Sequence, residues 1–478
     1  MAYNKNAHLR VNIDAIKTAF TLERENRQAT AREREILAAY SGFGAIKEIL
    51  DPLPANGSVN PLINELHQVL KENTIDEKEY KRLFDDLKNS ILTAFYTPSE
   101  VVSVLAETLS GSGVCPTRLL DPSAGTGVFA QAFKQHSPNT EVSCFEKDPI
   151  TGMILKHLHP EDKVSVAGFE NIEKKYAGYY DVAASNIPFG DVAVFDPAFS
   201  SDNNPAKKIA SRSIHNYFFL KSVDMVRPGG LVAFITSQGV LNAPANRPVR
   251  ESLMDSCEPV SVIRLPNNLF SEYAGTEVGS DLIVLQRKDK NTEFSQRQMD
   301  FIESRKLSNG ISVNNLFRDF SRVLQTQAKT DTDPYGKPAI VFTHEGGIEG
   351  MASDLQKMLK EDFSHYLDLQ HYQSHAPDIP AQQTETPPEI KPALEPDFDE
   401  LHPFWQSLED HWFSDEKEFW DKNPVRPEAE NKGVSETIEI NGKIPGEKPT
   451  ASSQGTLFGT DGTAGNKKPV LNTAPQPV

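Results

Sequence analysis

The fold is decided by one segment, Arg118-Leu119-Leu120-Asp121-Pro122-Ser123-Ala124-Gly125-Thr126-Gly127-Val128-Phe129. An apolar run, an acid, a loop with two glycines and a second apolar run predict a buried strand, a tight ligand-approaching loop and a helix. The third glycine of the dinucleotide fingerprint is missing, and no Gly-Lys-Ser/Thr of a phosphate-binding P-loop is present. An acid at this strand end suits an ammonium group better than a phosphate, because unlike charges attract.

Three further apolar runs follow, and each leads to a polar group. They are Val142 to Phe145 with Glu146, Val164 to Ala167 with Glu170, and Tyr180 to Ala184 with Asn186-Ile187-Pro188-Phe189. Open α/β sheets bind ligands at the carboxyl ends of their strands. The sequence therefore predicts one site at one sheet edge, with Glu146 placed where an acid grips ribose hydroxyls.

The tetrad Asn186-Ile187-Pro188-Phe189 predicts a site for an amine on a flat ring, such as adenine. The Asn186 side-chain oxygen can accept one amine hydrogen, and a backbone carbonyl in the turn can accept the other. The Phe189 ring can stack on the heterocycle, and Pro188 stiffens the turn. The same pattern also occurs in ordinary turns that bind nothing.

The rest of the chain predicts an α/β architecture with additions at both ends. Leu231 to Thr236 continues the sheet, and Val260 to Leu265 with Asp281 to Leu285 form an antiparallel hairpin at its end. The expected parts are a helical region (1–92), the sheet domain (93–290), a helical extension (291–372) and a largely disordered, acidic, Pro-rich tail (373–478). Arg24, Arg27, Arg32 and Arg34 alternate with glutamates, which favours a solvated helix face over a DNA-binding one.

Composition narrows the class of protein. The net charge of −18 is an argument against nucleic acid, but about half of the acidic excess lies after His371, so a local basic patch remains compatible. No run approaches a membrane span, and the polar start is not a secretory signal. The three cysteines are isolated, which argues against a zinc site or a disulfide framework and indicates the cytoplasm.

Together, Tyr96-Thr97-Pro98, the glycine loop and the Asn186 tetrad resemble the N6-adenine DNA methyltransferases of the amino-methylase class, in the motif order of type I modification subunits. Other motifs look like the methylase part of phage and mobile-element methylase–helicase proteins. These are Tyr40-Ser41-Gly42-Phe43-Gly44, His215-Asn216-Tyr217-Phe218 and Arg227-Pro228-Gly229-Gly230. The resemblance covers residues 35–288 and implies a Rossmann-like sheet that binds S-adenosyl-L-methionine and acts in restriction-modification.

The resemblance also assigns roles. The residues implied in cofactor binding are Thr97, Pro98, Asp121, Pro122, Ser123, Ala124, Gly125, Thr126, Gly127, Glu146 and Glu170. Asn186 and the Ile187 carbonyl would hold the target amine, Pro188 would shape the turn, and Phe189 would stack on a flipped adenine, with Phe270 a candidate for its other face. Lys207, Lys208 and Arg212 are candidate DNA contacts, and no metal is implied.

Two departures leave alternatives open. Ile187 stands where the family usually has proline, and Glu170 stands where it more often has aspartate directly after glycine. The alternatives are an inactive DNA- or cofactor-binding module of a mobile element, acting in anti-restriction, and a methyltransferase on RNA or protein. At Thr97 and Ser99, a helix cap alone is the competing interpretation.

Partners are expected beyond DNA itself. No long segment of the sequence predicts a DNA-recognition domain. Either a separate specificity subunit or a helicase partner supplies recognition, or the sequence preference is low. Gln454-Gly455-Thr456-Leu457-Phe458 looks like a sliding-clamp-binding peptide, and no membrane partner is expected. An aromatic acidic stretch from Phe404 to Trp420 predicts a helix that docks on a partner or on the core, or only a local hydrophobic cluster.

Overall fold

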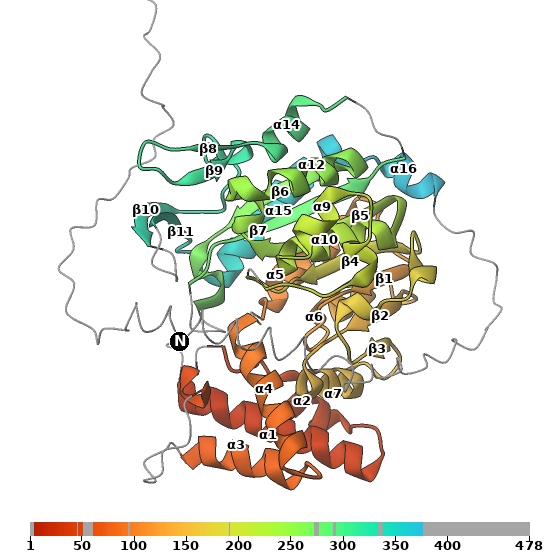
Figure 1. The fold of residues 1–478 in the computed structure, drawn as a ribbon, viewed down its shortest axis with the longest axis vertical. Coiled ribbons are helices and arrows are strands. Elements are labelled where there is room, and N and C mark those ends of the chain that lie inside the picture. Colours follow the sequence, from red (N-terminus) through yellow and green to blue (C-terminus); the bar gives the residue numbers. More distant parts are fainter. Residues whose placement is uncertain are drawn as a thin grey trace, which may run out of the picture. The chain divides into compact units, whose positions relative to one another are not determined.

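A seven-stranded sheet runs through the centre of the computed structural model (Figure 1), which describes residues 4–44, 46–50, 61–93, 96–190, 192–271, 277–289, 293–332 and 338–375. Its strand order is β3-β2-β1-β4-β5-β7-β6. The strands are β1 (Arg118–Asp121), β2 (Glu141–Phe145), β3 (Lys163–Ser165), β4 (Tyr180–Asn186), β5 (Val226–Ser237), β6 (Cys257–Leu265) and β7 (Ser280–Arg287). Strands β1 to β5 are parallel, and β7 is antiparallel to both neighbours. The predicted α/β class and closing hairpin are confirmed.

Helices cover both faces of the sheet, and the strands are therefore buried on both sides. One layer holds α5 (Ser99–Gly111), α6 (Val128–His136) and α15 (Gly347–Tyr366), and the other holds α10 (Ile214–Met225), α12 (Arg247–Ser256) and α14 (Gln296–Ile302). The short helices are α8 (Pro197–Ser200), α9 (Pro205–Ala210), α11 (Gly239–Asn242) and α16 (Leu369–Ser374). Each layer has its own apolar core.

The amino-terminal part is helical, as predicted. Its helices are α1 (Lys5–Glu25), α2 (Ala31–Ala38), α3 (Pro61–Glu72) and α4 (Glu77–Thr93), and they share a core with α7 (Pro149–Leu158) of the sheet domain. The predicted solvated arginine face is confirmed, since Arg27 pairs with Glu25 and Glu33, and Arg32 pairs with Glu35.

The region 291–372 is not purely helical, and that part of the prediction is wrong. Besides α14 and α15 it contains the hairpins β8 (Ser304–Lys306) with β9 (Ser312–Asn314) and β10 (Gln327–Thr332) with β11 (Pro338–Thr343). The first three of these strands are short and mostly polar, so they carry little apolar alternation to read. The domain boundaries stay predictions, and the aromatic stretch 404–420 and the clamp-like peptide 454–458 lie outside the described residues.

A buried ion pair joins the two strands of the closing hairpin. Arg264 on β6 donates to both carboxylate oxygens of Asp281 on β7, at 2.9 and 3.1 Å, and also to Asn242 at 3.0 Å. The Arg264 guanidinium lies 4.0 Å from the ring centroid of Phe317. Since both side chains are at most 2% exposed, each charge depends on the other for compensation.

Among the described helices, none combines the length and the apolar composition that crossing a membrane requires.

Candidate active site

The glycine loop between β1 and α6 is held close to its neighbours. The Ala124 amide donates to the Phe145 carbonyl at the end of β2, at 2.9 Å. Gly127 has a φ of 87°, and a Cβ added there would lie 2.2 Å from His159 Nε2. Only glycine therefore fits at this position without displacing His159.

Asp121, at the end of β1, is completely buried beside this loop. Its Oδ1 accepts from the Ser185 hydroxyl at 2.7 Å and from the Ser123 amide at 3.3 Å. Its Oδ2 is buried without a hydrogen-bond partner among the described residues. Burial raises the pKa of Asp121 to about 7, and the bonds from Ser185 and Ser123 oppose that shift. The uncompensated oxygen suits a cationic ligand.

Glu146, directly after β2, is tied to the same loop. Its two oxygens accept from the Gly125 amide at 2.9 Å and from the Asp148 amide at 2.8 Å. Burial, with a further contribution from the Asp148 carboxylate, raises the pKa of Glu146 to about 7. A carboxylate offers about four lone pairs, so acceptor capacity remains for ligand hydroxyls.

Ser185 brings the Asn186 tetrad next to Asp121. Its hydroxyl reaches Asp121, and it also lies 3.2 Å from the Ser123 carbonyl. The tetrad is fixed on its other side, because the Ile187 amide donates to the Ile235 carbonyl of β5 at 3.0 Å. Asn186 therefore directly follows Ser185, the residue that links β4 to the glycine loop.

The two aromatic candidates lie together but not in parallel. The Phe189 and Phe270 ring centroids are 6.3 Å apart, with planes at 81°. Both side chains are buried, at 5% and 0% exposure. A flat base therefore cannot lie between them in this arrangement, and stacking on Phe189 stays a prediction.

The helix-cap interpretation of Thr97 and Ser99 is wrong. Helix α5 starts at Ser99 with Pro98 in the cap position and without a side-chain cap bond. The Thr97 hydroxyl is instead buried without a hydrogen-bond partner in the described part of the chain. A polar atom held in this state is available to a ligand.

Two residues that the sequence reasoning did not place at the site are Gly42 and Tyr96. A Cβ added at Gly125 would lie 3.5 Å from the Tyr96 ring, and one added at Gly42 would lie 2.6 Å from it. Asn12 of α1 holds the turn, accepting from the Ser41 amide at 3.1 Å and donating to the Gly42 carbonyl. The turn 40–44 was recognised as a motif, but its contact with the ring behind the glycine loop was not.

The three candidate DNA contacts, Lys207, Lys208 and Arg212, differ in exposure and in their partners. Lys207 bridges Asp202 and Asp224 at 2.9 Å each, so its charge is compensated within the protein, and its contact with DNA stays a prediction. Lys208 and Arg212 are exposed.

Glu170 lies on a short 3-10 turn (Phe169–Asn171) with its carboxylate folded towards Gly168, and no hydrogen bond joins it to the glycine loop in the described residues.

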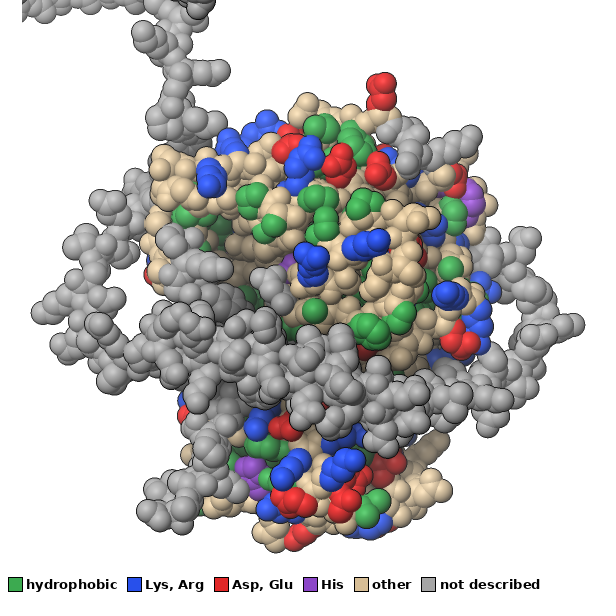
Figure 2. Space-filling view, viewed as in Figure 1, with side chains coloured by type: hydrophobic (Ala, Val, Ile, Leu, Met, Phe, Trp, Pro, Cys, Tyr) green, Lys and Arg blue, Asp and Glu red, His purple; other side chains and the backbone are tan. Residues whose placement is uncertain are grey.

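The described part of the face in Figure 2 shows basic side chains scattered among acidic and apolar ones rather than in one stripe.

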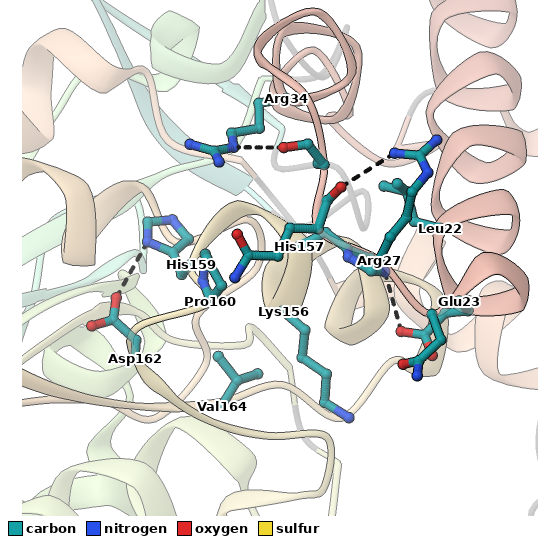
Figure 3. A pocket seen from close by; sticks show the side chains of 13 residues that line it. Leu22, Glu23, Arg27, Arg34, Lys156, His157, His159, Pro160, Asp162 and Val164 are labelled. Carbon is teal, nitrogen blue, oxygen red and sulfur yellow. Dashed lines mark hydrogen bonds and ion pairs between the residues drawn. The ribbon is translucent and has the colours of Figure 1, made fainter.

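A separate cavity of about 370 Å³ lies between α1, the start of α2 and the end of α7 (Figure 3). Several of its polar groups already have partners: Arg34 donates to the Ala29 carbonyl, Arg27 to the Gln28 carbonyl, and His157 and His159 lie 3.2 and 3.3 Å from Glu23 and Asp162. The strand ends remain the better candidate site.

Comparison with known proteins identifies the family of this chain. The model of the N-6 DNA Methylase family matches residues 82–339. The chain is 26% identical over 198 residues to the defense against restriction protein B of Escherichia phage P1, covering 41% of this chain and 8% of that protein. It is 27% identical over 174 residues to the type II methyltransferase M.XamI of Xanthomonas campestris pv. amaranthicola, covering 34% and 33%.

A third relative is the methylase subunit of the type I restriction enzyme EcoEI of Escherichia coli, with 22% identity over 244 residues, 45% of this chain and 49% of that protein. The chain thus spans less than half the length of each of these relatives. Family membership implies S-adenosyl-L-methionine as the methyl donor. Because the family match extends over more than half of its residues, the chain belongs to the N-6 DNA methylase family.

Proposed function

We propose that this chain transfers a methyl group from S-adenosyl-L-methionine to the N6 amine of an adenine in DNA. One observation carries the proposal: the Ser185 hydroxyl bonds to Asp121 at 2.7 Å. This bond joins the strand that ends in the Asn186 tetrad to the loop suited to the methyl donor. Donor and acceptor sites on adjacent parallel strands are the arrangement that methyl transfer to an amine needs.

The residues at the strand ends fit S-adenosyl-L-methionine. The partnerless Oδ2 of Asp121 suits its cationic methionine part, the glycine loop admits close backbone approach, and Glu146 suits the ribose hydroxyls. The buried Thr97 hydroxyl offers a further polar contact. When bound, the cofactor supplies a methyl group on a sulfonium centre.

The Asn186 tetrad would hold the acceptor. An adenine inside a duplex is inaccessible, so it would be flipped out of the stack. The Asn186 oxygen and the Ile187 carbonyl would accept the two amine hydrogens, directing the nitrogen lone pair towards the donor. Most of the acceleration would come from this positioning, since β5 fixes the start of the tetrad through the Ile187 amide.

Cofactor affinity is expected to depend on pH. The raised pKa values of Asp121 and Glu146 mean that the ligand-free folded protein retains protons that the unfolded chain releases. These groups therefore lower stability as pH rises from about 4 to about 7, and a bound cation reverses the effect by favouring the carboxylates. Affinity should be about fivefold weaker at pH 6 than at pH 7 for each carboxyl that must ionise.

Calorimetry between pH 5.5 and 7, in buffers of different ionisation enthalpy, measures this proton release directly. The Asp121→Asn variant should bind more weakly at pH 7 and release fewer protons on binding. The assignment would be contradicted if the affinity of the wild type did not change between pH 5.5 and 7 and binding released no protons.

Replacing Ile187 with proline, the usual family residue, is expected to destabilise this chain rather than to improve it. Proline has no amide hydrogen, so the 3.0 Å bond to Ile235 would be lost, and the Ile187 side chain is 1% exposed. The expected loss is about 1–3 kcal/mol in the free energy of unfolding, measured in urea. An Ile187→Val variant, which keeps the amide, should lose less than the proline variant; equal losses would show that the amide bond is not responsible.

The proposed function is tested by expressing the full chain in a host without adenine methylation and mapping N6-methyladenine in its genome. Modified adenine in a defined motif, absent with the Asn186→Ala variant, is the expected result for an enzyme with its own specificity. Scattered methylation would place specificity on another chain. Absence of DNA methylation despite cofactor binding would overturn the proposal and favour an inactive module, or an RNA or protein methyltransferase if those substrates are labelled.

We further propose that recognition of the DNA sequence comes from a separate chain. One relative is named as a subunit of a type I restriction enzyme, and of the three predicted DNA contacts Lys208 and Arg212 are exposed. A helicase partner and a clamp partner at Gln454–Phe458 remain proposals from the sequence.

A further inference from the structure

Two histidines and an aspartate converge where helix α16 meets the end of β7. His371 Nδ1 lies 3.8 Å from one oxygen of Asp289, and His375 Nε2 lies 3.6 Å from the other. One ligand atom from each residue can be chosen so that all three lie within 4.8 Å of one another. The histidines are four residues apart on and just after α16, which puts both rings on the same side of the helix.

Backbone carbonyls determine which ring nitrogens face Asp289. His371 Nε2 lies 3.2 Å from the Arg287 carbonyl, and His375 Nδ1 lies 3.3 Å from the His371 carbonyl. A carbonyl oxygen only accepts, so the tautomer that fits metal binding carries its ring hydrogens on these two nitrogens. The Ser374 hydroxyl is compatible with it, since it donates to the His371 carbonyl at 3.0 Å and can accept from His375 Nδ1, also at 3.0 Å. The lone pairs are then on His371 Nδ1 and His375 Nε2, the atoms that point to Asp289. Metal-binding imidazoles are oriented by such carbonyl bonds to their second nitrogen.

We propose that Asp289, His371 and His375 bind a divalent transition-metal ion of the zinc class. Two imidazole nitrogens and one carboxylate oxygen are a ligand set that Zn²⁺ accepts. Ligands with bonds of about 2.0–2.2 Å in a tetrahedron stand about 3.4 Å apart. The three ligand atoms lie within 4.8 Å of one another, so an ion would draw them together by side-chain rotation. The side chains are 19%, 38% and 46% exposed for His371, His375 and Asp289, which leaves access for water as the fourth ligand.

The topology gives this site a structural role. Strand β7 is antiparallel to β5, so its end lies at the sheet edge opposite the glycine loop and the Asn186 tetrad. Gln286 of β7 already exchanges two hydrogen bonds with the Asp368 backbone, at 2.8 and 2.9 Å, just before α16. A bound ion would add a second link between the same strand and helix. The isolated cysteines argued against zinc, but this site needs no thiolate.

Metal binding is tested with the full chain, using Zn²⁺ in calorimetry and Co²⁺ as a spectroscopic probe. The expected result is one ion per chain, visible Co²⁺ absorption typical of a low-coordinate nitrogen–oxygen site, and a zinc-dependent rise in the thermal unfolding midpoint. His371→Ala, His375→Ala and Asp289→Asn should each weaken binding at least about tenfold and abolish the rise.

Two variants serve as controls. His365→Ala removes an exposed histidine of α15 outside the cluster, and Glu161→Gln alters a second group, His159, Glu161 and Asp162, that could also hold an ion. Both should bind zinc as the wild type does. The proposal is overturned if the folded wild type binds no zinc, if Glu161→Gln abolishes binding, or if His375→Ala and Asp289→Asn leave affinity unchanged. Because the readouts do not involve methyl transfer, failure here is separate from failure of the proposed function.

Discussion

An Asn186→Ala variant is expected to lose methyl transfer by a factor of about 10² to 10³, the usual effect of removing one fixed polar group that contacts the reacting centre. The side chain stands at the end of β4, one residue after the Ser185–Asp121 bond. Removing it deletes one of the two proposed acceptors for the amine. The cofactor contacts of Asp121 and Glu146 remain, so S-adenosyl-L-methionine affinity should stay close to that of the wild type.

The measurement is single-turnover transfer to DNA with saturating cofactor, paired with calorimetric cofactor binding. Asn309→Ala is a matched control, because Asn309 is exposed in the turn between β8 and β9. Transfer at the wild-type rate in Asn186→Ala would remove the residue from the proposed site. Loss of cofactor binding together with transfer would instead assign it to the donor site.

Asp281→Ala is expected to lower the free energy of unfolding by about 3–5 kcal/mol, because it leaves the Arg264 guanidinium buried without its counter-charge. Among the described residues, the Arg264 guanidinium would keep Asn242 and the face of Phe317. The Arg264 side chain is 2% exposed, so bulk solvent does not screen the charge that remains. Urea or guanidinium unfolding measures the change.

The exposed pair Arg32–Glu35 provides the comparison, with side chains 80% and 67% exposed. Glu35→Ala should cost only about 0–1 kcal/mol, since solvent screens that pair. Similar losses in the two variants would show that burial does not determine the strength of the Arg264–Asp281 pair. Asp281→Ala should also disturb the turn after β6 that carries Phe270, which lies next to Phe189.

The sheet and its glycine loop could be predicted because their information is local. Apolar runs mark β1, β2, β4 and β5, and the glycines mark the loop between β1 and α6. The carboxyl ends of parallel strands share one edge, so Asp121, Glu146 and Asn186 were expected together. Local pattern does not reveal which side chains bond to one another. The hydrogen bond between Ser185 and Asp121 joins residues 64 positions apart, and the residues around Ser185 do not predict it.

Ion pairs between residues far apart in the sequence, and strands without an apolar pattern, could not be predicted. Lys207 reads as a free cation until Asp224, seventeen residues later, is seen beside it. Strand β10 pairs with β11, and polar residues such as Gln327 and Thr332 leave β10 without the apolar alternation that would predict a strand. The cluster of Asp289 with His371 and His375 joins residues more than 80 positions apart, which spacing motifs do not reach.

The contact of Tyr96 with Gly42 bears on how much of this chain supports the candidate site. The family match begins at residue 82, yet one edge of the Tyr96 ring lies against the turn that Asn12 holds, and the other lies near Gly125. A protein that began at residue 82 would keep every motif residue of the glycine loop and the Asn186 tetrad. It would lose the turn 40–44, which lies against the Tyr96 ring. In this protein, the boundary drawn by sequence similarity therefore differs from the boundary of the structure that supports the Tyr96 ring, which reaches back to Asn12.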